Sequence, residues 1–62
     1  MSHTTASKKQ IIARVRRIAG QLNGIERALE DEVGCEKVLH LVAGARGAMN
    51  GLLEEILADF VR

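Results

Sequence analysis

Residues 11–29 read IIARVRRIAGQLNGIERAL, and this stretch decides the predicted fold. Its apolar residues recur at steps of four and three, which places them on one side of an α-helix: Ile11, Val15, Ile18, Leu22, Ile25 and Leu29. Such spacing is typical of a helix whose apolar seam packs against another helix. We therefore predict a helix over residues 7–30, preceded by a flexible polar arm at residues 1–6.

The pattern stops at residues 31–34 and resumes at Cys35, which predicts a tight turn and a second, antiparallel helix over residues 35–62. The seam continues along it at Val38, Val42, Ala45, Met49, Leu52, Ile56 and Phe60. Four more residues widen the apolar arc to over half of the circumference: Leu39, Leu53, Leu57 and Val61. One helix cannot cover so wide an arc, so we expect the hairpin to associate with other copies of itself.

Length and composition favour an all-α class. The chain has 62 residues, no proline and a single aromatic residue, Phe60. A chain this short is marginal alone, and one cysteine cannot form an internal disulfide, so oligomerisation is expected. No stretch approaches the roughly 20 apolar residues that span a bilayer, which favours a cytoplasmic protein without a membrane partner. We expect one helical domain, residues 1–62, truncated so that a C-terminal helix is missing.

Charge is divided unevenly along the chain, although the formal net charge is only +1. Every charged residue in the first 25 positions is basic, whereas acidic residues dominate the remainder. Arg14, Arg17 and Gln21 share a stripe beside the apolar seam of the first helix, while Arg16 projects to the opposite side. A row of guanidinium groups on a rigid helix can follow nucleic-acid phosphates. The alternative interpretation is a solvated charged face.

The second helix carries glycines and acids that need separate interpretation. Glycine in a helix costs about 0.5–1 kcal/mol relative to alanine. The strip of Gly44, Gly47 and Gly51 therefore favours the close approach of another backbone in a bundle of several chains, with local flexibility as the alternative. The acids are interpreted as an exposed helix face: Glu54, Glu55 and Asp59. No nucleophile and base pair or Gly-rich loop supports catalysis, so a small hydrolytic enzyme is the least favoured class.

Cys35 is the candidate sensing residue. It opens the second helix, where the positive end of the helix dipole attracts an anion, and thiolates bind metals and attack electrophiles. A small buried apolar residue is the alternative. Removal of Met1 would leave the Ser2 amine beside the His3 imidazole as a pair of nitrogen donors, unless this tail is disordered. A helix roughly 35 Å long separates them from Cys35, so these groups could meet only between chains.

These features together resemble the CsoR/RcnR/FrmR family of small bacterial repressors, which sense copper, nickel, cobalt or formaldehyde. The resemblance covers all 62 residues and is carried by MSHT at 1–4, RVRRIAGQLNGIERALE at 14–30, Cys35, and GARGAMNGLLEEIL at 44–57. It implies hairpins assembled into a four-helix-bundle dimer and a disc-like tetramer, a dimer of dimers. It also implies double-stranded operator DNA as partner, contacted by Arg14, Arg17 and Gln21, with Arg16 and Arg46 as weaker candidates.

The resemblance further implies the effector ligands. Cys35, His3 and the Ser2 amine match metal ligands of the nickel/cobalt branch, which makes nickel, cobalt or zinc a candidate effector. Phe60 stands where that branch has a histidine, so a complete octahedral site is not visible. Formaldehyde is the rival effector, bridging the Cys35 thiolate and the Ser2 amine without any metal cofactor.

The prediction is therefore a DNA-binding transcriptional repressor that releases its operator when a metal ion or formaldehyde occupies an intersubunit site at Cys35. The alternative, from a different class, is a structural helical oligomerisation module that binds neither ligand nor DNA.

Overall fold

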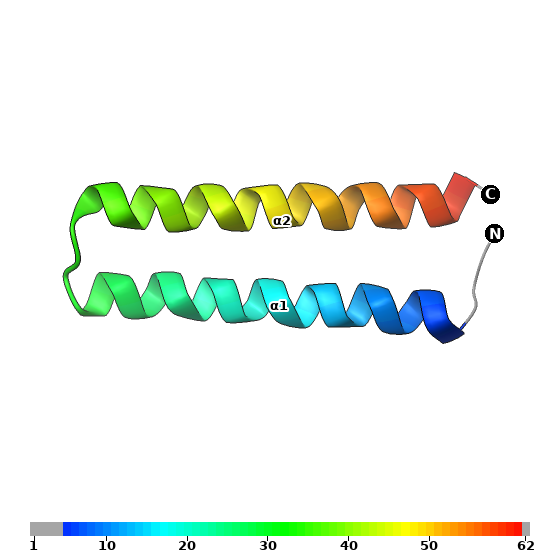
Figure 1. The fold of residues 1–62 in the computed structure, drawn as a ribbon, viewed down its shortest axis with the longest axis horizontal. Helices are drawn as coiled ribbons and strands as arrows, with labels where there is room; N and C mark the ends of the chain where they lie inside the picture. Colours follow the sequence, from blue (N-terminus) through cyan, green and yellow to red (C-terminus); the bar gives the residue numbers. More distant parts are fainter. Residues whose placement is uncertain (1–4, 62) are drawn as a thin grey trace.

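The computed structural model describes residues 5–61, which form two antiparallel helices joined by a short turn (Figure 1). Helix α1 runs over Thr5–Glu30 and helix α2 over Cys35–Val61. The predicted all-α hairpin is confirmed. Helix α1 begins before the predicted residue 7, so Thr5 belongs to the helix and not to the arm. The remainder of the predicted arm, with Ser2 and His3, lies outside the described residues.

The turn is closed by backbone hydrogen bonds at the end of α1. The Glu32 amide donates to the carbonyl of Leu29 at 3.2 Å, and the Val33 amide donates to the carbonyl of Ala28 at 3.1 Å. This is the Schellman arrangement, in which one residue takes the left-handed backbone conformation. That residue is Glu32, with φ 56°, although Gly34 is the glycine that marks the turn in the sequence. The Gly34 carbonyl instead accepts hydrogen bonds from the first turn of α2.

The helices pack along a seam that includes only about half of the residues that the apolar pattern predicted. Buried or half-buried side chains recur in heptad spacing on α1, at Ser7, Ile11, Arg14, Ile18, Ile25 and Ala28. The matching positions on α2 are Val38, Leu41, Ala45, Ala48, Leu52, Glu55 and Asp59. Only three described residues are buried: Ile18, Ala28 and Ala45 are each 5–7% exposed. The apolar core therefore lies between the middle of the hairpin and the turn.

Half of the predicted seam faces away from the partner helix, which corrects that prediction. Its outward members are 41–60% exposed: Val15, Leu22, Leu29, Val42, Met49 and Ile56. The physical reason is that Arg14, Gln21 and Ala28 occupy every second seam position of α1, so the apolar pattern is displaced to one flank. Leu39, Leu53 and Leu57 are also exposed, as expected for an arc too wide for one partner.

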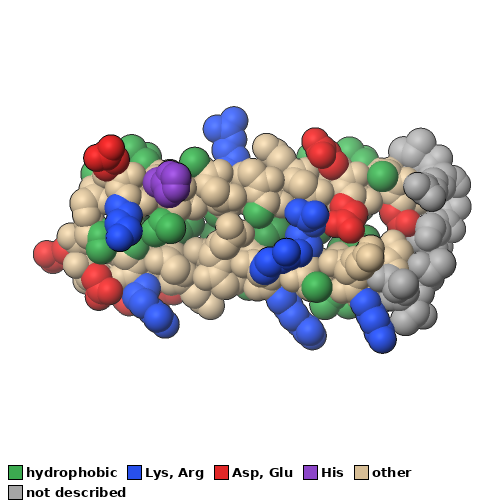
Figure 2. Space-filling view, in the orientation of Figure 1, with side chains coloured by type: hydrophobic (Ala, Val, Ile, Leu, Met, Phe, Trp, Pro, Cys, Tyr) green, Lys and Arg blue, Asp and Glu red, His purple; other side chains and the backbone are tan. Residues whose placement is uncertain are grey.

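The hairpin is a thin slab, 44 × 17 × 9 Å, with two different faces. At 100° per residue, most exposed apolar side chains of both helices fall on one face. We call this the apolar face, and it comprises Val15, Leu22, Leu39, Val42, Met49 and Leu53. We call the opposite face, on the side of Arg14, Arg17 and Gln21, the polar face. It is the face seen in Figure 2, where Lys and Arg side chains lie along α1 and over the middle of the hairpin. Neither described helix is long and apolar enough to cross a membrane.

Candidate functional site

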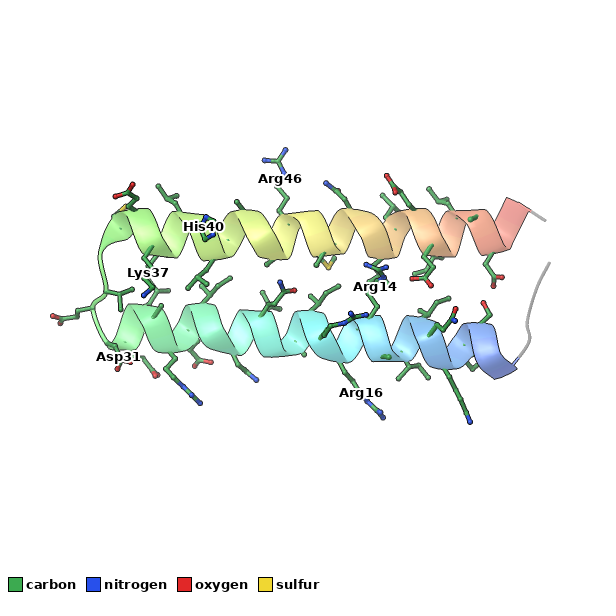
Figure 3. The ribbon with its side chains drawn as sticks, in the orientation of Figure 1. Arg14, Arg16, Asp31, Lys37, His40 and Arg46 are labelled. Atoms are coloured by element: carbon green, nitrogen blue, oxygen red, sulfur yellow. The ribbon has the colours of Figure 1, made fainter. Side chains whose placement is uncertain are left out.

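Arg14 lies between the helices and is held by Glu55 (Figure 3). Its Nε donates to Glu55 Oε1 at 2.8 Å, the one ion pair among the described side chains. The two side chains are 35% and 31% exposed, so the pair is reached by solvent and contributes less than about 1 kcal/mol to folding. Its effect is geometric, since it fixes where one end of the Arg14 guanidinium lies.

The glycine strip of α2 gives room to polar side chains of α1. A Cβ added at Gly51 would lie 2.7 Å from Arg14 Nη1, and one added at Gly44 would lie 4.0 Å from Gln21 Nε2. Arg14 and Gln21 are seven residues apart, as are Gly51 and Gly44, so the same pairing of positions repeats along the antiparallel helices, with the closer approach at Gly51. Within the chain, side chains of α1 approach Gly51 and Gly44. The predicted approach of a backbone from another chain stays a prediction.

The other predicted DNA-contacting residues divide between the polar face and the edges. Arg17 and Gln21 are exposed, and their spacing from Arg14 places all three on one side of α1. Arg16 projects from α1 away from α2, and Arg46 projects from α2 away from α1 (Figure 3). One hairpin therefore brings together Arg14, Arg17 and Gln21 and does not bring Arg16 or Arg46 to them.

Cys35 is a free, exposed cysteine at the turn end of the hairpin. Its steps of four and seven to Leu39 and Val42 place it on the apolar face. Helix α1, about 39 Å long for its 26 residues, separates the turn end from Thr5. The three residues from Thr5 back to Ser2 can span at most about 11 Å, which is much shorter than α1. The Ser2 amine therefore cannot meet Cys35 of the same chain.

No group of three His, Cys, Asp or Glu that could hold a metal is found among the described residues. His40 is exposed on the polar face, away from Cys35. The side chain of Phe60 lies outside the described set. Cys35 is thus chemically suited to a metal as one donor, and the described part of one chain does not complete a site.

Two acids that sequence reasoning placed on an exposed face are partners of α1 instead. Glu54 is exposed as predicted, but Glu55 is half-buried against Arg14, and Asp59 accepts a hydrogen bond from Ser7 Oγ at 3.4 Å. Both continue the heptad that begins at Val38, and this spacing was the signal that could have found them. It was hidden because the stronger apolar pattern runs along the neighbouring flank.

Alanine substitutions should distinguish Gly47, which has open space beside it, from Gly51, which contacts Arg14. Gly47→Ala meets nothing within 4 Å, so it should raise the free energy of unfolding by about 0.5–1 kcal/mol through helix propensity. Gly51→Ala should gain less, because its Cβ must displace the end of the Arg14 side chain. Thermal unfolding followed by circular dichroism measures both. An equal gain at the two positions would contradict the Arg14 contact, and a loss at Gly47 would indicate a neighbouring chain there.

Residues 7–62 match the family model described as metal-sensitive transcriptional repressor. The chain belongs to this family. The metal-sensitive transcriptional repressor family consists of transcriptional regulators and not of enzymes, in agreement with the prediction that this protein has no enzymatic activity. The predicted membership of the CsoR/RcnR/FrmR group is confirmed by this match and by the similarity to an RcnR homolog and to FrmR.

Three bacterial proteins illustrate the similarity of this chain to known sequences and structures. The chain is 50% identical over 62 residues to an uncharacterized protein in the bioA 5′ region of Serratia marcescens. It is 39% identical over 57 residues to a transcriptional repressor RcnR homolog of Escherichia coli O139:H28. It superposes with a TM-score of 0.88 and 46% identity on the E64H variant of the formaldehyde-responsive regulator FrmR from Salmonella enterica serovar Typhimurium.

These matches cover nearly the whole chain but only part of each relative. They extend over 100%, 92% and 92% of this chain and over 68%, 63% and 64% of the respective relatives. The chain therefore spans about two thirds of the length of the proteins it matches.

Proposed function

We propose that this protein is a DNA-binding transcriptional repressor that releases its operator when an effector occupies an intersubunit site at Cys35. The match of residues 7–62 to the metal-sensitive repressor family carries this proposal. The polar face supports the DNA-binding part, because Arg14, Arg17 and Gln21 lie on one rigid helix beside a strip of glycines that projects no side chains. Such a face can approach a phosphate backbone closely. Operator binding also places the protein in the cytoplasm.

Assembly into dimers and tetramers is the second part of the proposal. The apolar face exposes large side chains from both helices, whereas a single hairpin buries only three residues among those described. A second hairpin laid on this face would complete a four-helix bundle, and two such dimers would form a tetramer. Cys35 lies on the same apolar face, which supports a sensor site shared between chains.

Two effector classes are compatible with Cys35. A thiolate with an imidazole and an amine suits nickel, cobalt or zinc, with Cys35, His3 and Ser2 as the donors. Formaldehyde is the rival, since one carbon could join the Cys35 sulfur to the Ser2 nitrogen. The family description favours a metal, and the FrmR relative responds to formaldehyde.

Operator binding should be tested on a duplex from the promoter region of the protein's own gene. Arg17→Ala should weaken binding at least about tenfold and reduce the slope of log affinity against log salt by about 0.9 per lost phosphate contact. Arg27→Ala is the matched control, because Arg27 is exposed on the same helix but lies on the edge away from α2. Gel retardation at several salt concentrations provides the measurement.

Two results would contradict this part of the proposal. Indifference of the wild-type protein to duplex DNA at low salt would favour the structural oligomerisation module. Equal losses for Arg17→Ala and Arg27→Ala would leave only a general charge effect and remove the polar face as the contact surface.

A further inference from the structure

The ion pair between Arg14 and Glu55 lies within the face proposed to meet DNA. Its partners come from different helices, 41 residues apart in the chain, and the Nε to Oε1 distance is 2.8 Å. Both side chains are about one third exposed, so the pair is neither sealed in a core nor free in solvent. An anion approaching Arg14 from outside therefore meets a cation with a carboxylate already beside it.

The geometry leaves part of the guanidinium able to bind a second anion. Arginine carries five N–H donors in a planar fork, and Glu55 engages the one on Nε. The Nη1 end lies over Gly51, where an added Cβ would be only 2.7 Å away. Glycine thus lets the fork lie against the backbone of α2, with Glu55 at one edge.

Electrostatics decides what Glu55 does to a bound phosphate. Two unit charges about 6 Å apart in water interact with an energy equal to about a threefold change in an equilibrium constant, and with more where the effective dielectric constant is lower. The Glu55 carboxylate repels a phosphate on Arg14 by an effect of this order. It also holds the guanidinium in place, and these two effects act in opposite directions on DNA affinity.

We infer that Glu55 is an internal counter-charge that holds Arg14 in place and attenuates the affinity of the polar face for DNA phosphates; this inference rests on the proposed operator binding. Effectors typically change the affinity of a coupled site about 5- to 150-fold. If the protein binds its operator with limited affinity, a loss of affinity of this size is enough to release the DNA. A much tighter complex would stay bound after the same loss. Glu55 would set the affinity within the range that the effector controls.

The test compares Glu55→Gln with Glu54→Gln. Both remove one negative charge from neighbouring positions of α2, but Glu54 is exposed and has no contact with Arg14. Glutamine keeps an oxygen that accepts from Arg14 Nε, so the first substitution removes the charge and keeps the geometry. Glu55→Gln should bind the promoter duplex about three- to tenfold more tightly than Glu54→Gln, with a steeper salt dependence. Circular dichroism checks that both variants are helical.

Each other result overturns the inference in a recognisable way. Equal affinities of the two variants would remove any special role of Glu55, and weaker binding by Glu55→Gln than by wild type would mean that its charge assists Arg14. In an Arg14→Ala background the two substitutions should be equivalent, so a surviving difference would show that Glu55 acts without Arg14. Absence of DNA binding by the wild-type protein at low salt would instead refute the proposed function itself.

Discussion

Replacing Cys35 with alanine should leave operator binding intact and abolish release of the DNA by the effector. Cys35 is the only thiol in the chain and is exposed at the turn end, far from Arg14 and Arg17 on the polar face. Effector coupling typically changes DNA affinity about 5- to 150-fold, and this whole factor should disappear. The measurement is fluorescence anisotropy of the promoter duplex during titration with nickel, cobalt, zinc and formaldehyde in turn.

Serine at position 35 serves as the matched control. Cys35→Ser keeps the size and polarity of the residue that begins α2 but lacks the thiolate, so it should fail in the same way as Cys35→Ala. The wild-type protein identifies the effector as the compound that releases the DNA. If both variants respond to that effector with the affinity of the wild type, Cys35 is not the sensor.

A charge placed on the apolar face should have the largest effect on stability. Leu53 is 56% exposed in the single hairpin, and we expect the assembly to cover it. Leu53→Glu would bury an unpaired carboxylate at that contact, at a cost of several kcal/mol, which is comparable with the whole stability of a small domain. The variant should lose both its oligomeric mass and much of its helicity, because one hairpin alone has too small a core. Sedimentation velocity and far-UV circular dichroism measure the two effects.

Asn50→Glu provides the comparison for this substitution. Asn50 is exposed on the same helix, and its position on the helical wheel is turned toward the edge that faces away from α1. The added charge there should leave mass and helicity unchanged. An unchanged mass for Leu53→Glu would show that the apolar face is not the contact between chains.

The two helices could be predicted because helical periodicity and turn signals are properties of neighbouring residues. The ends at Glu30 and Cys35 agree with the predicted ones, and α1 starts at Thr5 and not at residue 7. The predicted end of the second helix at residue 62 lies outside the described residues. The stripe of Arg14, Arg17 and Gln21 followed from spacing alone. Cys35 at the start of α2 followed in the same way, and its separation from Ser2 followed from the rise per residue.

The pairing of the helices could not be predicted in the same way. Most of the outward apolar residues lie on one face of the hairpin. The strongest apolar pattern therefore combined residues of the internal seam with residues of the face that is exposed to other chains. The internal seam contains Arg14, Glu55 and Ser7, which a search for apolar periodicity passes over. Glu55 was consequently interpreted as a solvated residue.

The sequence by itself determined that this chain forms two amphipathic helices, that one hairpin cannot cover its own apolar surface, and that its basic stripe and its cysteine are separated along the helices. The tertiary structure decided which flank of each helix faces the other. It thereby decided that Arg14 is bound to Glu55 above Gly51. The physical reason is that such contacts join residues far apart in the chain, and their register depends on how all the side chains of the seam pack together.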